Sequence, residues 1–599
     1  MTRRPKGPIL LALALAGIPA GTVPALAQQA LERHPVAVPV PPRGAITIDA
    51  ANYSSNDRTP FGVALTGVTL IGETEAVLAH PARGIVAAGA PVSDGKDAIR
   101  PALVAALSPF LGKQLSPYEI AALQAAVAAV YRDFGLPFTS VTVPPQEITA
   151  GVLQLRVITF RAGTVQVTGR GGAPLPDAAQ IAAGVRLRPG QTIDARALSE
   201  DIDWLNRIPY RHVGAVFSPG EATALTNLSL EVSKVRPWSL TAGWSNSGSK
   251  ETGVQRYSFG GGVWLPALNG TTLSYLMTGG NDFLHHPGRI ALDDGDYPQY
   301  LSQAARIVIP TAARQQLEFT PNLVTTRQSL GSSTSVQNLT FELPVTYRTA
   351  VSNVLPGRYW GELYGGVVVK GLMRKVFFAG TPVGSSTARL MQFTLGWSDT
   401  IPGQHGETAL DLSVVVNPGD TIANSSDADW SAYSNGRVTS ASYAYSVLNV
   451  TRNTDLGPLW GKKNYAWVSQ FTGLLAGNAL PDTERLALGG SAGSRGYDFS
   501  DVSVDRGAIW RNELRLPGLT TPAGFGTTAH FSPYFLADAA WGQDLSSRAS
   551  DTLISLGAGV DISIGGKLVG GITAGRAMTD AGAVTAGSWS VQGDLTLRF

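Results

Sequence analysis

The stretch WSVQGDLTLRF, residues 589–599, alternates apolar and polar side chains along nearly its whole length. One parity is apolar and ends on an aromatic ring: Trp589, Val591, Leu595, Leu597 and Phe599. The other parity is polar: Ser590, Gln592, Asp594, Thr596 and Arg598. Successive side chains of a β-strand point to opposite faces. The stretch therefore predicts a strand with one face in an apolar medium and the other in water.

The same alternation continues upstream as far as Trp238, for example in residues 238–245, 391–397 and 554–563. The polar parity carries Ser, Thr and Gly, as a water-filled lumen does, whereas a soluble sandwich would carry Lys and Glu there. The apolar parity is aromatic near the strand ends, which is typical of a lipid-facing girdle. Residues 237–599 thus predict a transmembrane β-barrel of about 16 antiparallel strands, closed by pairing of its last strand with its first. A secreted array of β-sandwiches is the alternative.

Composition agrees with a barrel and excludes several other classes. Charged residues are 15% of the 599, against roughly 25% in a typical soluble domain. Glycine is abundant at 68 residues, and the mean hydropathy of +0.07 is too low for a polytopic helical membrane protein. The net charge of +2 gives no polybasic signature for nucleic acid. Because cysteine is absent, disulfides, cysteine-ligated metals and a cysteine nucleophile are excluded.

The N-terminus predicts secretion. Arg3, Arg4 and Lys6 precede a short apolar run, and Ala25-Leu26-Ala27 has the form of a cleavage site, so residues 1–27 read as a signal peptide. A membrane-anchor helix, the alternative, needs about 20 apolar residues, and prolines interrupt this run earlier. Residues 28–61 are a proline-rich extension in which only Gln28–His34 could be helical.

Two small α/β units are expected between the extension and the barrel, at residues 62–161 and 162–236. In the first, Ser116-Pro117-Tyr118-Glu119 combines an N-cap, a first-turn proline and a capping-box Glu, and two strands follow the helix. In the second, Asp194 can cap a helix, and strands follow at 213–217 and 228–232. The connection from Glu73 to Asp97 is long enough to hold an insertion.

The segment LPDTERLALGGSAGSRGYDFSDVSVDRGAIWRNELRLP, residues 480–517, resembles the signature of the Omp85 superfamily. It is most similar to the two-partner-secretion transporters of the hemolysin secretion/activation type (TpsB proteins). Glu484, Leu488-Gly489-Gly490 and Arg495-Gly496-Tyr497 stand where that family has its acidic residue, its Gly-Gly run and its V-R-G-Y tetrad, with Ser494 in place of Val. Tyr534 to Asp538 fits the second motif of the family, an aromatic-x-Asp, with Leu536 in place of Phe.

This resemblance implies the roles of the candidate site residues. The loop that carries Arg495, Gly496 and Tyr497 would fold back into the barrel, where Arg495 would pair with Asp538 of the wall and have Glu513 as a second acid. Phe599 would be the assembly signal. The two upstream units would be periplasmic POTRA domains, the second of the ShlB type. The family often carries an N-terminal plug helix, for which this extension has little room.

The expected function is export of a large hemolysin- or adhesin-like exoprotein across the outer membrane of a Gram-negative bacterium. Its partners would be that exoprotein, outer-membrane lipid and the barrel-assembly machinery, with no nucleic acid, cofactor, metal or enzymatic activity. Alternatives are a barrel-assembly factor of the Bam or Tam type, which usually carries three or more POTRA domains, and a passive porin. Gly489 to Gly493 matches the esterase pattern G-x-S-x-G, but no helix is expected after it. His285-His286 is expected to be a solvated loop, not a metal site. The sequence leaves the exported substrate and the oligomeric state open.

Overall fold

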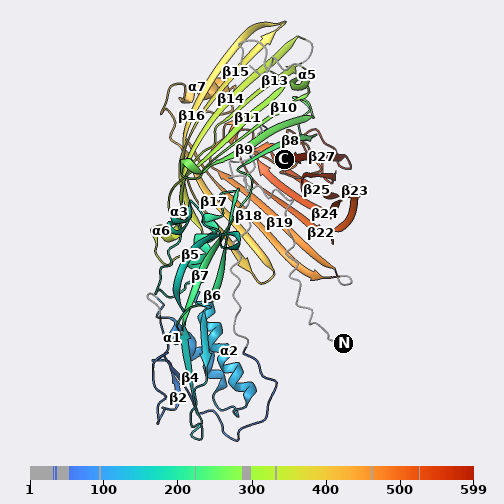
Figure 1. Ribbon diagram of the computed structural model, residues 1–599. Coiled ribbons are helices and arrows are strands. Elements are labelled where there is room, and N and C mark those ends of the chain that lie inside the picture. Colours follow the sequence, from blue (N-terminus) through green and yellow to red (C-terminus); the bar gives the residue numbers. More distant parts are fainter. Residues whose placement is uncertain are drawn as a thin grey trace.

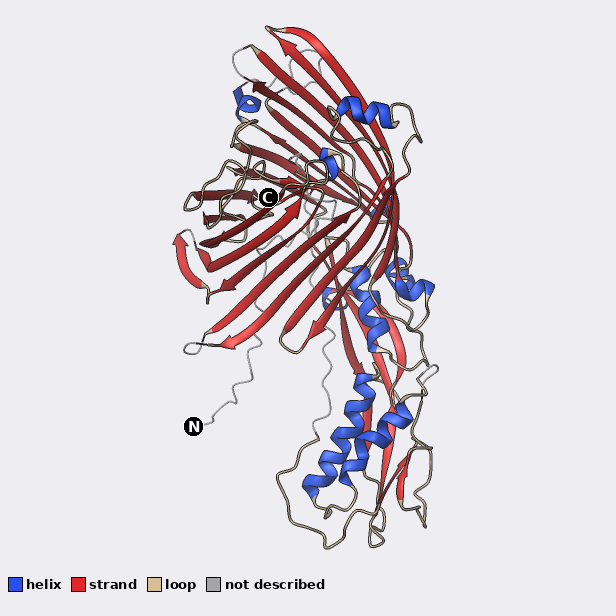
Figure 2. Ribbon diagram, turned by 180° about the vertical axis from the view of Figure 1, so that it is seen from behind, coloured by secondary structure: helices blue, strands red, loops and turns tan. Residues whose placement is uncertain are grey.

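A computed structural model describes Glu32, residues 34–36, 53–92, 96–222, 224–285, 298–330, 333–459, 463–524 and 526–599. Two α/β units are stacked below a large barrel, and the chain passes through them in order before it enters the barrel (Figure 1). The view from behind shows that the long helices belong to these units and that the barrel wall consists of strands (Figure 2). No helix in the described ranges is long and apolar enough to cross a membrane. The expected signal peptide and plug segment Gln28–His34 fall outside the described residues, apart from Glu32 and His34.

The first unit packs two helices on a four-stranded sheet of order β2-β1-β4-β3. Its elements are β1 (Gly67–Ile71), β2 (Gly84–Val86), α1 (Ile99–Leu107), η1 (Ser108–Phe110), α2 (Pro117–Asp133), β3 (Thr139–Thr142) and β4 (Val152–Thr159). As the sequence predicts, Ser116 caps α2, and its Oγ accepts the Glu119 N–H at 3.2 Å. The short strand β2 lies in the long connection 73–97 and pairs with β1 in parallel. That connection thus adds an edge strand to the unit.

The second unit has the same order of elements without a counterpart of β2, and its sheet has three strands in the order β5-β7-β6. It contains β5 (Arg161–Gly169), η2 (Arg170–Gly172), α3 (Ala178–Ala183), α4 (Ala195–Leu205), β6 (Arg211–Pro219) and β7 (Leu225–Lys234). Asp194 caps α4, since its carboxylate accepts the N–H groups of Arg196 and Ala197. Ile181, Leu198, Ile202 and Leu230 are fully buried or nearly so and form the core between helices and sheet.

The barrel is a closed sheet of sixteen antiparallel strands, which confirms the predicted fold class. Its first half holds β8 (Trp238–Ser245), β9 (Arg256–Leu265), η3 (Pro266–Leu268), β10 (Thr271–Gly279), α5 (Asn281–His285), β11 (Tyr300–Ala312), β12 (Gln315–Phe319), β13 (Asn322–Leu330), β14 (Thr334–Ala350), α6 (Val351–Val354), β15 (Glu362–Phe378) and β16 (Thr381–Gly403). Its second half holds β17 (Gly406–Asn417), α7 (Asp427–Tyr433), β18 (Tyr443–Pro458), β19 (Asn464–Ala476), η5 (Asp482–Glu484), β20 (Leu486–Ala487), β21 (Ser503–Val504), β22 (Arg506–Arg515), β23 (Leu519–Gly524), β24 (Thr527–Gln543), β25 (Ser550–Ile564), β26 (Leu568–Ala577) and β27 (Trp589–Arg598).

Two wall strands are interrupted. Segments β12 and β13 both pair with β11 and β14, and β22 and β23 both pair with β24, so each pair of segments is one strand. The interruptions contain Pro321 and Pro517. Proline lacks the N–H that a sheet ladder needs, so each break falls where one ladder donor is missing, although Pro344 and Pro533 lie inside unbroken strands.

The barrel closes where β27 pairs with β8, in the register Leu595↔Trp244 and Leu597↔Ala242. Beyond the last paired residue, Phe599 and Leu240 exchange backbone hydrogen bonds of 2.9 and 3.4 Å. Phe599 itself is half exposed on the outer face, as are Trp589 and Trp238. The alternation of apolar and polar residues in the sequence predicts these side chains to face lipid.

The lumen differs in part from the expected water-filled channel lined by small polar residues. Toward the end of the barrel that faces away from the α/β units, the inward-facing side chains of β15 to β25 are partly apolar. They pack against loops that fold into the lumen. Trp430 of α7 is 1% exposed in this core, which also buries the lumenal side chains of Leu390, Tyr445 and Leu474. The prediction of a lumen lined by small polar residues is wrong here, because apolar loop residues that fold into the lumen pack against apolar side chains of the wall.

The second unit is docked against the short turns of the barrel by ion pairs. Asp201 of α4 is 1% exposed and bonds to Arg314 of the β11–β12 turn at 2.9 Å and to Arg186 at 3.0 Å. Burial works to lower the pKa of Arg186, but Asp201 and Glu200 outweigh it and raise that pKa above its usual value. Arg207 reaches Glu362 at the start of β15 at 2.7 Å. The unit is therefore fixed at the mouth of the barrel.

Candidate functional site

The segment between β19 and β22, residues 477–505, folds back into the barrel and is called here the lumenal loop. It descends through η5 and β20 and returns through β21, with Leu486 opposite Val504 and Ala487 opposite Ser503. Ser494, Arg495 and Tyr497 at its tip are at most 3% exposed. The tip is thus enclosed by the wall, and it carries the residues that the family resemblance singled out.

Arg495 binds Asp538 of β24 with two parallel hydrogen bonds. Its Nε lies 2.9 Å from Oδ2 and its Nη2 lies 2.8 Å from Oδ1, and its backbone N–H also donates to Oδ2 at 3.1 Å. Asp538 is 2% exposed. A fork-to-fork pair of this kind fixes orientation as well as distance, and it is strong because little water competes for it.

Glu513 of β22 provides the second acid. Its Oε1 accepts a bond from Arg495 Nη1 at 2.5 Å, and its Oε2 accepts one from Arg515 at 2.6 Å. Arg515 continues to Asp561 of β25 at 2.8 Å. The structure therefore brings Arg495, Asp538 and Glu513 together, and it adds Arg515 and Asp561, which belong to neither sequence motif.

Tyr497 and Gly496 seat the tip against β25 and the β26–β27 connection. The buried Tyr497 hydroxyl lies 2.7 Å from the Thr579 carbonyl and 3.1 Å from the Ile554 carbonyl. A Cβ added at Gly496 would lie 2.8 Å from both the Ala577 nitrogen and the Ser555 Cβ. Only glycine fits this close approach, because any side chain would push the tip off the wall.

A second buried charge cluster holds the descending arm of the loop. Glu484 accepts bonds from Lys370 of β15 at 2.5 Å and from the Tyr445 hydroxyl of β18 at 2.7 Å. Lys370 also lies 3.3 Å from Glu342, its partner across β14 and β15. The motif match had placed Glu484 but not its partners. A lone lysine on the inward parity of β15 is the signal that could have found Lys370.

The N-terminal extension reaches the lumen at Glu32. Its carboxylate pairs with Arg256 of β9 through contacts of 2.7 and 2.5 Å, and its carbonyl accepts the Tyr300 hydroxyl at 3.0 Å. Arg256 is 1% exposed. This anchor is a further contact that the sequence did not indicate.

The G-x-S-x-G match at Gly489 to Gly493 lacks the surroundings of a catalytic serine. Ser491 of the G-x-S-x-G match is exposed in the lumenal loop, which contains the short η5 but no longer helix in this described stretch. An esterase nucleophile would need a strand–turn–helix at this point. The side chains of His285 and His286 lie outside the described part.

Two family models match the chain. Residues 366–562, which include Arg495, Glu513 and Asp538, match the model for the haemolysin secretion/activation protein ShlB/FhaC/HecB. Residues 92–159, within the first unit, match the ShlB-type POTRA domain.

Two similar proteins are both named as outer membrane transporters of the CdiB type. The outer membrane transporter CdiB-2 of Burkholderia pseudomallei is 23% identical over 430 residues, which are 69% of this chain and 67% of that protein. The outer membrane transporter CdiB of Dickeya dadantii is 23% identical over 386 residues, 62% of this chain and 61% of that protein. The matches thus span about two thirds of these relatives.

Two solved structures share the fold. CdiB from Escherichia coli superposes with a TM-score of 0.65 at 16% identity, covering 92% of this chain and 94% of the other. CdiB from Acinetobacter baumannii gives 0.55 at 14% identity, covering 95% of each chain. Over residues 366–562, which carry the buried arginine motif, the chain is therefore similar to the ShlB/FhaC/HecB proteins, and it shares its fold with two CdiB structures.

Proposed function

We propose that this protein is an outer-membrane translocator that exports one large partner exoprotein by two-partner secretion, without catalysis. The observation that carries the proposal is the lumenal loop, whose Arg495 is held by Asp538 and Glu513 inside a barrel with two docked α/β units. In this proposal the second unit is a second POTRA domain. A passive porin needs neither the docked units nor the buried arginine.

Capture of the unfolded exoprotein would take place at the units, by addition of a strand to a sheet edge. In the first unit, the edge strand β3 is covered at Val141, whose N–H donates to Tyr53 and whose carbonyl accepts from Gln124, both at 2.7 Å. In the second unit, β6 forms an edge of its sheet, and its start is covered at Val213 by the side chain of Asn206. The remainder of β6 is the edge that we assign to substrate capture.

Movement through the barrel would be driven from outside. No ATP is available at this membrane. Folding of the exported chain outside the cell, beyond the end of the barrel that faces away from the α/β units, would therefore bias its movement outward. Outer-membrane lipid surrounds the exposed aromatic face, and insertion would depend on the barrel-assembly machinery, for which Phe599 is the proposed signal.

The test is to look beside this gene for a reading frame that encodes a large secreted protein and to measure export of that protein. We expect that protein in the medium or on the surface of cells that make the translocator, and inside cells that carry an empty vector. Equal export from both strains would refute the proposal. The levels of unrelated outer-membrane barrels are measured in parallel, because their fall on deletion of this gene would instead indicate an assembly factor.

A further inference from the structure

Three loops of the barrel meet at one buried carboxylate, at the point where the lumenal loop leaves the wall and returns to it. They are the lumenal loop, the β17–β18 loop and the β24–β25 loop. Asp505, the last residue of the lumenal loop, is fully buried. Its Oδ1 accepts the N–H of Leu480 at 2.9 Å, and its Oδ2 accepts the N–H of Leu545, in the β24–β25 loop, at 2.7 Å. One side chain thus joins both ends of the lumenal loop to a neighbouring loop.

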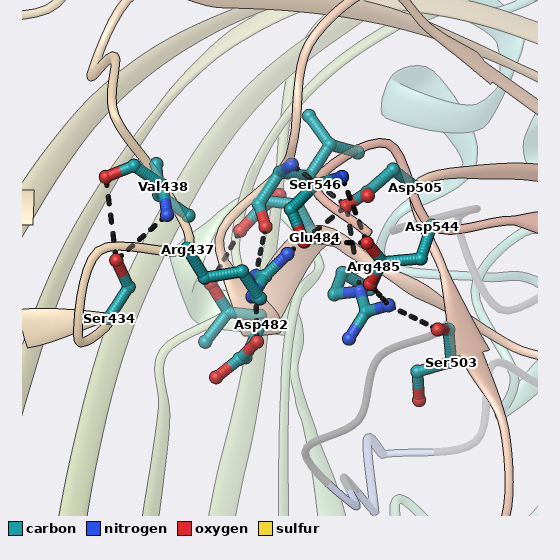
Figure 3. A network of polar contacts seen from close by, with 12 residues as sticks. Ser434, Arg437, Val438, Asp482, Glu484, Arg485, Ser503, Asp505, Asp544 and Ser546 are labelled. Atoms are coloured by element: carbon teal, nitrogen blue, oxygen red, sulfur yellow. Dashed lines mark hydrogen bonds and ion pairs between the residues drawn. The ribbon is translucent and has the colours of Figure 1, made fainter. Parts of the chain in front are cut away.

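Arg437 brings in the loop between β17 and β18, which contains α7. Its Nη2 donates to Asp482 at 2.7 Å and to the Leu480 carbonyl, and its Nη1 lies 3.4 Å from Asp505. The loop that carries Arg437 is itself anchored, because Trp430 of α7 is buried in the lumenal core. Figure 3 shows Arg437 and Asp482 facing each other beside Asp505.

Arg485 completes the arrangement from within the lumenal loop. Its Nη2 donates to Asp544 of the β24–β25 loop at 2.6 Å and to the Ser503 carbonyl, and its Nε lies 3.5 Å from Asp505 (Figure 3). Burial works to raise the pKa of Asp544, but hydrogen bonds from Ser546 and Ser547 and the charge of Arg485 lower it to about 2. Two arginines therefore lie among the three carboxyl groups of Asp482, Asp505 and Asp544, and we call these five side chains the root cluster.

We propose that the root cluster, centred on Asp505, is a positioning device that sets how far the lumenal loop reaches into the barrel. This inference rests on the proposed function, since it assigns to the cluster the task of presenting Arg495 to its acids. The hairpin between root and tip pairs through two strand residues on each side and through one further bond, from the Leu488 N–H to the Val502 carbonyl at 2.9 Å. Glu484 also holds its descending arm, whereas the root cluster fixes both ends of the loop together.

The geometry favours positioning over simple attachment. The tip is attached by Asp538 and Tyr497, but those contacts form only when the loop arrives at the right depth and angle. Fixing both ends at one carboxylate restricts the conformations open to the loop, so less entropy is lost when the tip docks.

The experiment measures tip docking by a disulfide in the otherwise cysteine-free chain. The Oγ atoms of Ser494 at the tip and Ser555 of β25 lie 3.0 Å apart, so Ser494→Cys with Ser555→Cys should cross-link on oxidation. Into this pair we introduce Asp505→Asn, whose amide nitrogen cannot accept a hydrogen bond and whose charge is lost to both arginines. Asp97→Asn, an exposed change of the same kind in the first α/β unit, is the matched control.

We expect the cross-linked fraction of heat-modifiable barrels to fall roughly tenfold with Asp505→Asn and to be unchanged with Asp97→Asn, because bonds to charged groups are strong. An unchanged fraction with Asp505→Asn would overturn the proposal. If that variant gives no folded barrel, Arg437→Gln is used in its place, because it leaves both N–H bonds to Asp505 intact. We expect a smaller fall in the cross-linked fraction, and an unchanged fraction would again overturn the proposal. The cross-link does not depend on export, so failure of the proposed function would appear separately, as absent export by the unmodified protein.

Discussion

Arg495→Ala is expected to abolish export while the protein still reaches the outer membrane as a heat-modifiable barrel. The variant leaves Asp538 buried without its guanidinium, and breaking a buried pair in this way costs about 3–5 kcal/mol. At about 1.4 kcal/mol for each factor of ten, the docked fraction of the loop falls by at least roughly a hundredfold. The barrel itself survives because its strands pair around the whole wall without the loop.

Two variants separate the role of this arginine from a general loss of charge. Arg495→Lys keeps the charge but not the fork, so partial export is expected. Arg506→Ala removes an exposed arginine of the same strand as Glu513 and should export normally. Normal export by Arg495→Ala, measured at equal outer-membrane level, would remove the loop from the mechanism.

Deletion of residues 62–236 should give an inserted barrel that exports nothing. The units contact the barrel through its short turns and Glu362, not through the wall ladder. After deletion, Glu362 keeps Arg348 at 3.0 Å and Arg314 keeps Asn353 at 3.0 Å, so no buried charge at the mouth loses all its partners. Insertion should therefore persist while substrate capture is lost.

The measurement compares barrel heat-modifiability and exoprotein export for this deletion and for the full chain at matched levels. A deletion of residues 62–159 alone keeps the docked second unit and tests whether β6 suffices for capture. If the protein that lacks residues 62–236 still exports, the α/β units do not capture the substrate.

The wall could be read from the sequence because its periodicity is local. Alternation places Trp589 and Leu597 on lipid without knowledge of any partner strand, and the caps Ser116 and Asp194 define two helix starts within four residues of sequence. The strand count followed from length alone. The breaks at Pro321 and Pro517 did not, because a proline at a barrel bulge looks the same in sequence as one in a turn.

The site could be predicted only through the family resemblance. Arg495 and Asp538 lie 43 positions apart, and Lys370 and Glu484 lie 114 apart, so their pairing depends on barrel curvature that no local pattern encodes. The same holds for Asp505, whose partners come from three loops. The apolar part of the lumen was missed because Trp430 enters it from a loop, outside the strand alternation.

Because loss of the Arg495 pair is expected to abolish export, we expect export to take place with the lumenal loop docked, and this can be checked by locking the loop. The Ser494→Cys, Ser555→Cys chain is oxidised in the outer membrane, and export of the exoprotein is followed before and after a reductant is added, with each single-cysteine variant as control. We expect the cross-linked barrel to export as much as the reduced one. Export that stops on oxidation and returns on reduction would instead show that the loop must leave its site.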